Sequence, residues 1–126
     1  MLVESGAPWC IENVPGAPLV NPAMLCGTMF GLRTYRHRLF ETSFFMMQPP
    51  HVKHNGTTNA QHGYSSFAAG AVMISCAGNN FRREDGAAAM QIDWPMTRPE
   101  VANAIPPAYS EYIGRAALQQ IDRRAA

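Results

Sequence analysis

Cysteine is scarce in this chain, and long apolar runs are missing. Three cysteines among 126 residues is an odd number without paired spacing, which is typical of free, mostly buried thiols in a reducing compartment. No apolar run is long enough to cross a bilayer. The first residues do not combine a basic region with an apolar stretch, so no signal peptide is expected. These absences predict a cytoplasmic protein with no membrane partner.

An excess of charge of one sign is also missing. The formal net charge is +1, so the sequence provides no large electrostatic footprint for nucleic acid. Lys53 is the only lysine, and the other basic residues are all arginine. Arginine suits bidentate contacts to phosphates and base edges. A GC-rich genome would produce the same excess of arginine and alanine, so both explanations stay open.

The remaining composition favours one folded domain with many loops. Apolar residues make up 47% of the chain and charged residues 15%, as in globular rather than disordered proteins. A chain of 126 residues is long enough for a small domain with a core. Ten glycines and ten prolines predict plentiful loops. We therefore expect a single domain over residues 1–126.

The segment Trp9–Gly16 predicts a buried strand that stops abruptly. Its first three residues are apolar and suit a covered, pleated surface, and its last two are Pro-Gly, which forces a turn. Glu12 falls where the strand would leave the sheet. A buried carboxylate needs a partner, and ligands bind at this edge of open α/β sheets. Glu12 is therefore a candidate for chemistry. The alternative is that Glu12 and Asn13 only cap the turn.

Two arginines precede a second predicted strand, over residues 39–44. Arg36 and Arg38 are two positions apart, so on a strand their side chains would face the same side. Two guanidinium groups on one side would attract an anion or a carboxylate such as Glu12. The alternative is an exposed edge strand with solvated charges.

A polar loop over residues 48–63 contains three histidines, His51, His54 and His62. The His-x-x-His spacing could form a metal site together with Cys76. The paired cysteines that make such patterns specific are missing. Solvated loop histidines are therefore the default interpretation, and no metal is expected.

The other segments predict a coarse order of elements. These are a short helix or turn over 23–30 that ends at Gly31, a strand over 67–77, a loop over 78–86, a helix over 98–104 and a last helix over 107–122. Thr97 and Glu100 form a capping box for the fourth of these. The last helix has apolar residues at helical spacing from Tyr109 to Ile121.

Three motifs stand in a recognisable order. They are Ile-Glu-Asn-Val-Pro-Gly at residues 11–16, Thr-Tyr-Arg-His-Arg-Leu-Phe at 34–40 and Ala-Asn-Ala-Ile-Pro-Pro at 102–107. They resemble the ENV, QxRxR and GNxVPP-type motifs of C5-cytosine-specific DNA methyltransferases, with Thr34 in place of Gln and Ala102 in place of Gly. Residues 90–97 and the helix through 112–114 also look like the ending of the compact bacteriophage type. The resemblance covers about residues 8–118 and corresponds to the C-terminal half of the family.

The resemblance implies an α/β fold, a partial doubly wound, methyltransferase-like sheet with a short C-terminal helical segment. Residues 47–89 would be a short insertion in place of the target-recognition segment. It also implies a function in DNA methylation, with double-stranded DNA as partner and S-adenosylmethionine as cofactor.

The resemblance further implies roles for five residues. Glu12 would hold the flipped cytosine at N3 and the exocyclic amine, and the proton it shares there would make C6 a better electrophile. Asn13 would help fix the loop. Arg36 would contact the base O2, and Arg38 would brace the glutamate or contact phosphates. Asn103 would approach S-adenosylmethionine, although the missing glycine weakens the case for a close backbone approach.

Two parts of the family pattern are missing from the chain. There is no Pro-Cys dipeptide to supply the nucleophile and no GxG loop to bind the cofactor, so the chain cannot run the reaction alone. It could be one half of a split enzyme, an inert remnant, or a decoy that binds DNA or protein. Losing half of a parallel sheet would expose a strand edge and apolar faces, so we expect self-association or a partner half rather than a free monomer.

Overall fold

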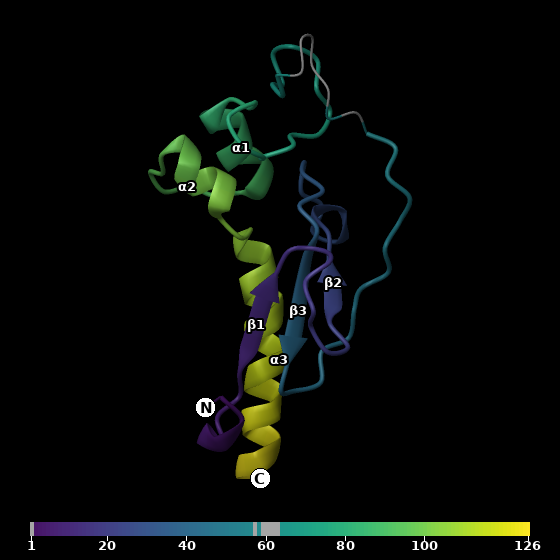
Figure 1. Cartoon of the computed structure of the whole chain (residues 1–126), viewed down its shortest axis with the longest axis vertical. Coiled ribbons are helices and arrows are strands. Elements are labelled where there is room, and N and C mark those ends of the chain that lie inside the picture. Colours follow the sequence, from purple (N-terminus) through teal and green to yellow (C-terminus); the bar gives the residue numbers. More distant parts are fainter. Residues whose placement is uncertain (1, 57, 59–63) are drawn as a thin grey trace. The chain divides into compact units, whose positions relative to one another are not determined.

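The structure is a computed structural model that describes residues 2–56, 58 and 64–126. Its elements are η1 (Val3–Ser5), β1 (Cys10–Asn13), β2 (Ala23–Leu25), η2 (Gly27–Phe30), β3 (Arg38–Thr42), α1 (Arg83–Met90), α2 (Arg98–Asn103) and α3 (Pro107–Ala125) (Figure 1). The mixture of helices and strands agrees with the α/β expectation.

The chain divides into two compact units, although one domain over 1–126 is expected from the composition. The first unit consists of Met1–Leu25, His37–Pro49 and Ala108–Ala126, and the second of Cys26–Arg36 and Pro50–Pro107. Most of the expected insertion over 47–89 therefore falls in the second unit.

The first unit contains a three-stranded sheet in the order β1-β3-β2 (Figure 1). Both outer strands run antiparallel to β3, with Glu12 and Ala23 each opposite Phe40. Every strand pair in this sheet is therefore antiparallel. A doubly wound sheet is built mainly from parallel pairs, and this sheet, as far as the chain is described, contains none. Among the described residues, β1 pairs with no strand but β3.

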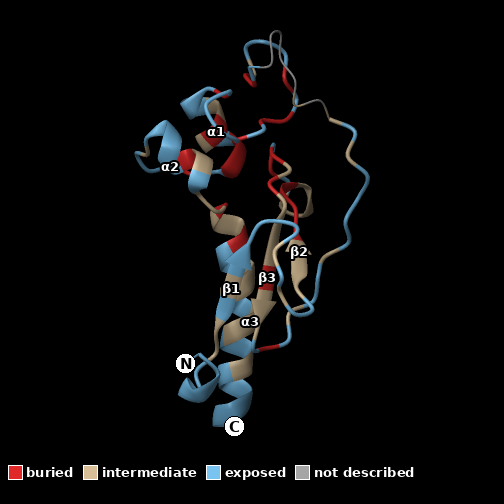
Figure 2. Cartoon of the chain, in the orientation of Figure 1, coloured by how far each residue is buried: buried red, intermediate tan, exposed pale blue. Residues whose placement is uncertain are grey.

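The prediction that the first strand is buried is wrong. Cys10, Glu12 and Asn13 are exposed and Ile11 is intermediate, so β1 is an open edge of the sheet (Figure 2). The apolar residues suit a covered strand, but β1 lies at an edge of the described sheet and only Ile11 is partly covered. Burial in this unit centres instead on Phe40 of β3, whose ring meets the ring of Tyr109 edge to face at 6.2 Å.

The last helix, α3, extends three residues beyond the predicted end at 122. Tyr109 is its only buried residue, and Leu118 and Ile121 are 60% and 45% exposed. The predicted apolar stripe is therefore buried at Tyr109, partly covered along the middle of the helix and exposed at Ile121. In the described part of the chain, no helix has the length and apolar character needed to span a membrane.

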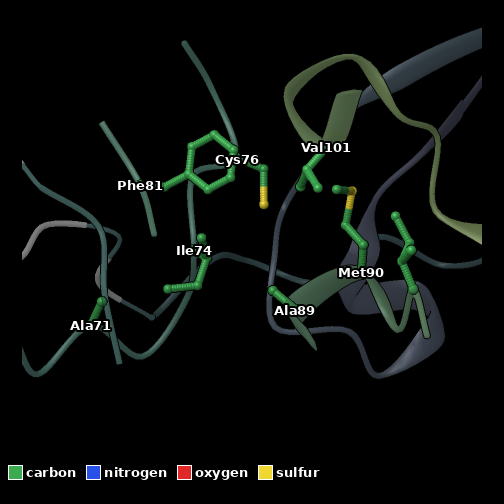
Figure 3. Close-up of a cluster of buried hydrophobic side chains, with 8 residues drawn as sticks. Ala71, Ile74, Cys76, Phe81, Ala89, Met90 and Val101 are labelled. Atoms are coloured by element: carbon green, nitrogen blue, oxygen red, sulfur yellow. The ribbon is translucent and has the colours of Figure 1, made fainter. Parts of the chain in front are cut away.

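The second unit has its own core, formed between α1, α2 and an irregular segment before them. Ile74, Phe81, Met90 and Val101 lie at its centre, together with the buried Cys76 (Figure 3). The core places the segment 71–81 against both helices.

The strand predicted over 67–77 is wrong. The carbonyl of Ser66 accepts from the amides of Ala69 and Ala71, which makes a turn, and Gly70 and Cys76 have positive φ. Neither feature is compatible with a continuous strand. The loop predicted over 78–86 is also partly wrong, because α1 begins at Arg83.

One local prediction is confirmed and another is confirmed in part. The amide of Thr97 donates to the Glu100 carboxylate over 2.6 Å and the Thr97 hydroxyl does so over 2.8 Å, so the capping box precedes a helix that ends one residue before the predicted end. The helix or turn predicted over 23–30 is confirmed only in its second part, where η2 ends at Gly31 in the left-handed conformation. Residues 23–25 form the strand β2, so the prediction is wrong there.

Candidate functional site

Glu12 and Arg38 form an ion pair on neighbouring strands of the first unit. Glu12 Oε1 lies 3.0 Å from Arg38 Nε, and the two side chains are 36% and 17% exposed. Arg38 Nη1 also donates to the carbonyl of His37 over 2.8 Å, which holds the guanidinium in place. The contact expected between Arg38 and the glutamate is therefore present, and it lies at the β1 edge of the sheet. The carboxylate is held but still reaches solvent, as a ligand-binding group requires.

Asn13 acts on the turn that follows β1. Its Oδ1 accepts from the amide of Val14 over 2.9 Å, and the residue is exposed. This contact fits a loop-fixing role and equally fits the simpler capping interpretation.

The neighbouring thiol is poorly suited to act as a nucleophile. Partial burial raises the pKa of the Cys10 thiol, and the carboxylate of Glu12 raises it further. A nucleophilic cysteine needs the opposite shift, because the thiolate is the reactive form. Cys10 does not replace the cysteine that the family motif supplies.

Arg36 lies in a different environment from the one that the resemblance implies. Its φ is +38°, and β3 begins only at Arg38, so the two arginines do not share a strand face and that prediction is wrong. The side chain is buried, with 8% exposed. Its Nε and Nη2 donate to the carbonyl of Ala104 over 3.1 and 2.8 Å. Nη2 also donates to Ala102 over 2.6 Å, and Nη1 to Cys76 over 2.8 Å. The guanidinium thus ties the backbone of the second unit together.

The two arginines therefore connect the motif at 34–40 to both of the others. Arg38 contacts Glu12 of the first motif within the first unit, and Arg36 holds residues 102–104 of the last motif within the second. The spacing of the two arginines was the signal in the sequence for this arrangement. The prediction that both lie on one strand was wrong, because β3 begins only at Arg38.

Asn103, the residue proposed to approach the cofactor, is exposed at the end of α2. Its Nδ2 donates to the carbonyl of Pro99 one helical turn earlier, over 3.0 Å. A surface hollow of about 500 Å³ lies near α2, but the residues that line it are Arg83 and members of the 95–100 segment. Asn103 is not among them.

The structure also brings together a cluster that the sequence pattern identified only in part. His51 and His54 meet Cys26, not Cys76, so the expected cysteine companion is wrong. Cys76 lies in the core instead, where burial raises the pKa of its thiol. His62, the third histidine of the loop, lies outside the described residues.

Comparisons with known proteins give no independent identification. No family model, curated protein or solved structure matches the chain.

Proposed function

We propose that the chain is the C-terminal portion of an S-adenosylmethionine-dependent DNA (cytosine-5) methyltransferase of bacteriophage type. It supplies part of the pocket for an extruded cytosine and works only when a further segment adds the nucleophile and the cofactor loop. In this proposal the three strands form one edge of a doubly wound sheet. The protein acts in the cytoplasm of a bacterial or phage-infected cell.

The observation that carries the proposal is the ion pair between Glu12 and Arg38. A carboxylate that must share a proton with cytosine N3 needs a fixed position and a free oxygen. Arg38 Nε holds Oε1 at 3.0 Å, and the Glu12 side chain keeps 36% of its surface. The pair joins the ENV-like and QxRxR-like motifs directly, although Glu12 and Arg38 are more than twenty positions apart in the sequence. In this proposal Arg36 is a positioning residue, which sets the backbone of the last motif through three hydrogen bonds and donates a fourth to the carbonyl of Cys76.

The open edge of the sheet supports the need for a further segment. The outer edge of β1 has no strand partner among the described residues, and an exposed edge is a template for pairing. The first unit also exposes large apolar side chains, including Val14, Val20 and Phe45 at 51%, 69% and 80%. In this proposal, parallel strands of a missing half would cover the open edge of β1 and the exposed apolar side chains. Without them we expect self-association, and a light-scattering mass equal to one chain at micromolar concentration would contradict this.

A binding experiment tests the pocket on this chain alone. Fluorescence anisotropy would compare a duplex with one unpaired cytosine against the same duplex with an abasic site at that position, at a fixed low salt concentration. The cytosine duplex should bind more tightly, because the carboxylate reads N3 and the exocyclic amine. Glu12→Gln should remove that preference. Glu111→Gln is the matched control, since Glu111 forms an exposed ion pair with Arg115 on α3.

A methyl-transfer assay tests the need for the missing parts. The chain alone should transfer no labelled methyl group from S-adenosylmethionine to DNA, and adding a half that carries the Pro-Cys and Gly-rich motifs should restore transfer. In the restored enzyme Glu12→Gln should lower the rate by about 10²-fold or more, as expected for a lost acid–base group. Activity of the chain alone would contradict the argument from the missing nucleophile.

The second candidate is an inert remnant or a decoy that binds DNA or protein. The missing nucleophile and cofactor loop are the observation that favours it. Equal binding of the cytosine and abasic duplexes, unchanged by Glu12→Gln, would favour this candidate over the enzyme fragment.

A further inference from the structure

Three side chains with metal-binding atoms converge in the second unit. Cys26 Sγ lies 3.3 Å from His54 Nε2, and His54 Nε2 lies 2.9 Å from His51 Nε2. Each of the three residues offers one ligand atom, and these atoms lie within 4.8 Å of one another. They come from two segments of the unit that are about 25 residues apart in the sequence.

The distances are close to those of a tetrahedral zinc site. Zinc binds imidazole nitrogen at about 2.0–2.1 Å and thiolate at about 2.3 Å, which separates two nitrogens by about 3.3 Å and a nitrogen from the sulfur by about 3.6 Å. The observed separations are shorter by only a few tenths of an ångström. Small side-chain rotations would open the triangle enough for the ion.

We propose that Cys26, His51 and His54 bind a divalent transition-metal ion, with zinc as the preferred ion. One thiolate and two imidazoles form a soft to borderline donor set, which favours zinc over magnesium or calcium. Three protein ligands leave the fourth tetrahedral position to water or another donor.

The surroundings of the cluster hold two of the ligands in place. Cys26 is fully buried at the start of η2, and its sulfur contacts Thr28 Oγ1 at 3.1 Å. The ring of His54 stacks on Tyr35, with centroids 3.7 Å apart and planes 11° apart. The Tyr35 hydroxyl donates to the carbonyl of Gly56 over 2.6 Å and accepts from its amide over 2.8 Å. Such outer contacts orient metal ligands and raise affinity.

The site would fasten a segment that has no regular secondary structure. Residues 50–55 form neither helix nor strand, and the metal would tie His51 and His54 to the buried Cys26. This role does not depend on the proposed methyltransferase function, so each can fail while the other stands.

Cobalt spectroscopy of the full chain under reducing conditions provides the test. Co(II) should bind in a one-to-one ratio and produce the visible bands of a tetrahedral ion and a thiolate-to-cobalt charge-transfer band, both removed by zinc. Cys26→Ser should abolish the charge-transfer band, and His54→Ala should weaken zinc binding by more than about 100-fold, beyond the 10–100-fold typical of an outer contact. Cys10→Ser is the matched control, because Cys10 is exposed and lies outside the cluster.

A second measurement keeps the test valid if the Cys26 variant fails to fold. Because Cys26 is buried without metal, alkylation is followed in mild urea, where local opening exposes the thiol. Zinc should slow the alkylation of Cys26 and leave that of Cys10 unchanged, as mapped by mass spectrometry. Tyr35→Phe should lower zinc affinity by about 10-fold, because it loses the Gly56 contacts. Cobalt binding without a thiolate band, equal alkylation of Cys26 with and without zinc, or no binding at micromolar metal would each overturn the proposal.

Discussion

Replacement of Arg36 by alanine tests whether one buried guanidinium holds the second unit together. The group makes four hydrogen bonds of 2.6–3.1 Å to the carbonyls of Cys76, Ala102 and Ala104. With 8% of the residue exposed, water cannot easily replace these bonds. The variant therefore removes the donor from the buried carbonyl of Cys76 and from the part-buried carbonyls of Ala102 and Ala104.

The expected loss of stability follows from these contacts. A hydrogen bond to a charged group contributes about 1.5–3 kcal/mol. The bonds share one side chain and are not additive, so we expect Arg36→Ala to lower the free energy of unfolding by about 3–4 kcal/mol. That is a large part of the 5–15 kcal/mol typical of small domains.

The positive φ at position 36 adds a second, independent expectation. The left-handed conformation costs a non-glycine residue about 1–2 kcal/mol and costs glycine little. Arg36→Gly loses the same hydrogen bonds as Arg36→Ala but relieves this strain. The glycine variant should therefore be about 1 kcal/mol more stable than the alanine variant, even after its larger loss of chain entropy.

Urea unfolding followed by circular dichroism measures all three proteins. Arg98→Ala is the matched control, because Arg98 is exposed at the first position of α2 and its removal changes the net charge equally. That control should stay within about 0.5 kcal/mol of the wild type. A free energy of unfolding of Arg36→Ala within 1 kcal/mol (roughly the error of such comparisons) of the wild type would contradict the role given to the guanidinium. A glycine variant less stable than the alanine variant would contradict the strain at position 36.

Two further predictions concern local packing and capping. A Cβ at Gly27 would lie 1.9 Å from the backbone oxygen of Thr34, so Gly27→Ala should lower the free energy of unfolding by at least about 3 kcal/mol. Gly114 on α3 has open space around it, so Gly114→Ala should raise the free energy of unfolding by about 0.5–1 kcal/mol. Equal melting temperatures of the two variants would contradict this. Hydrogen bonds from Thr97 lower the pKa of Glu100, so the capping contact is present above the unfolded-state pKa and is lost as pH falls through the lower folded-state pKa. Acidification should therefore destabilise the wild type more than Glu100→Gln, and parallel acid-unfolding curves would refute the link.

Local sequence signals determined the C-terminal third of the fold. The Thr97–Glu100 capping box and the apolar spacing from Tyr109 act within one or two helical turns, so α2 and α3 can be predicted without knowing their neighbours. The pairing of Glu12 with Arg38 was also accessible, because opposite charges attract and because the family resemblance implies that the second arginine braces the glutamate.

Only the tertiary structure decided the burial of β1, the role of Arg36 and the choice of cysteine. Cys10–Asn13 has the composition of a covered strand, but cover depends on elements that the sequence pattern of the strand does not contain. Arg36 turns to the backbone of residues 102–104 because a positive φ takes it off the strand. Cys26 rather than Cys76 meets His54, because chain folding over long separations sets which side chains meet, and no local spacing records it.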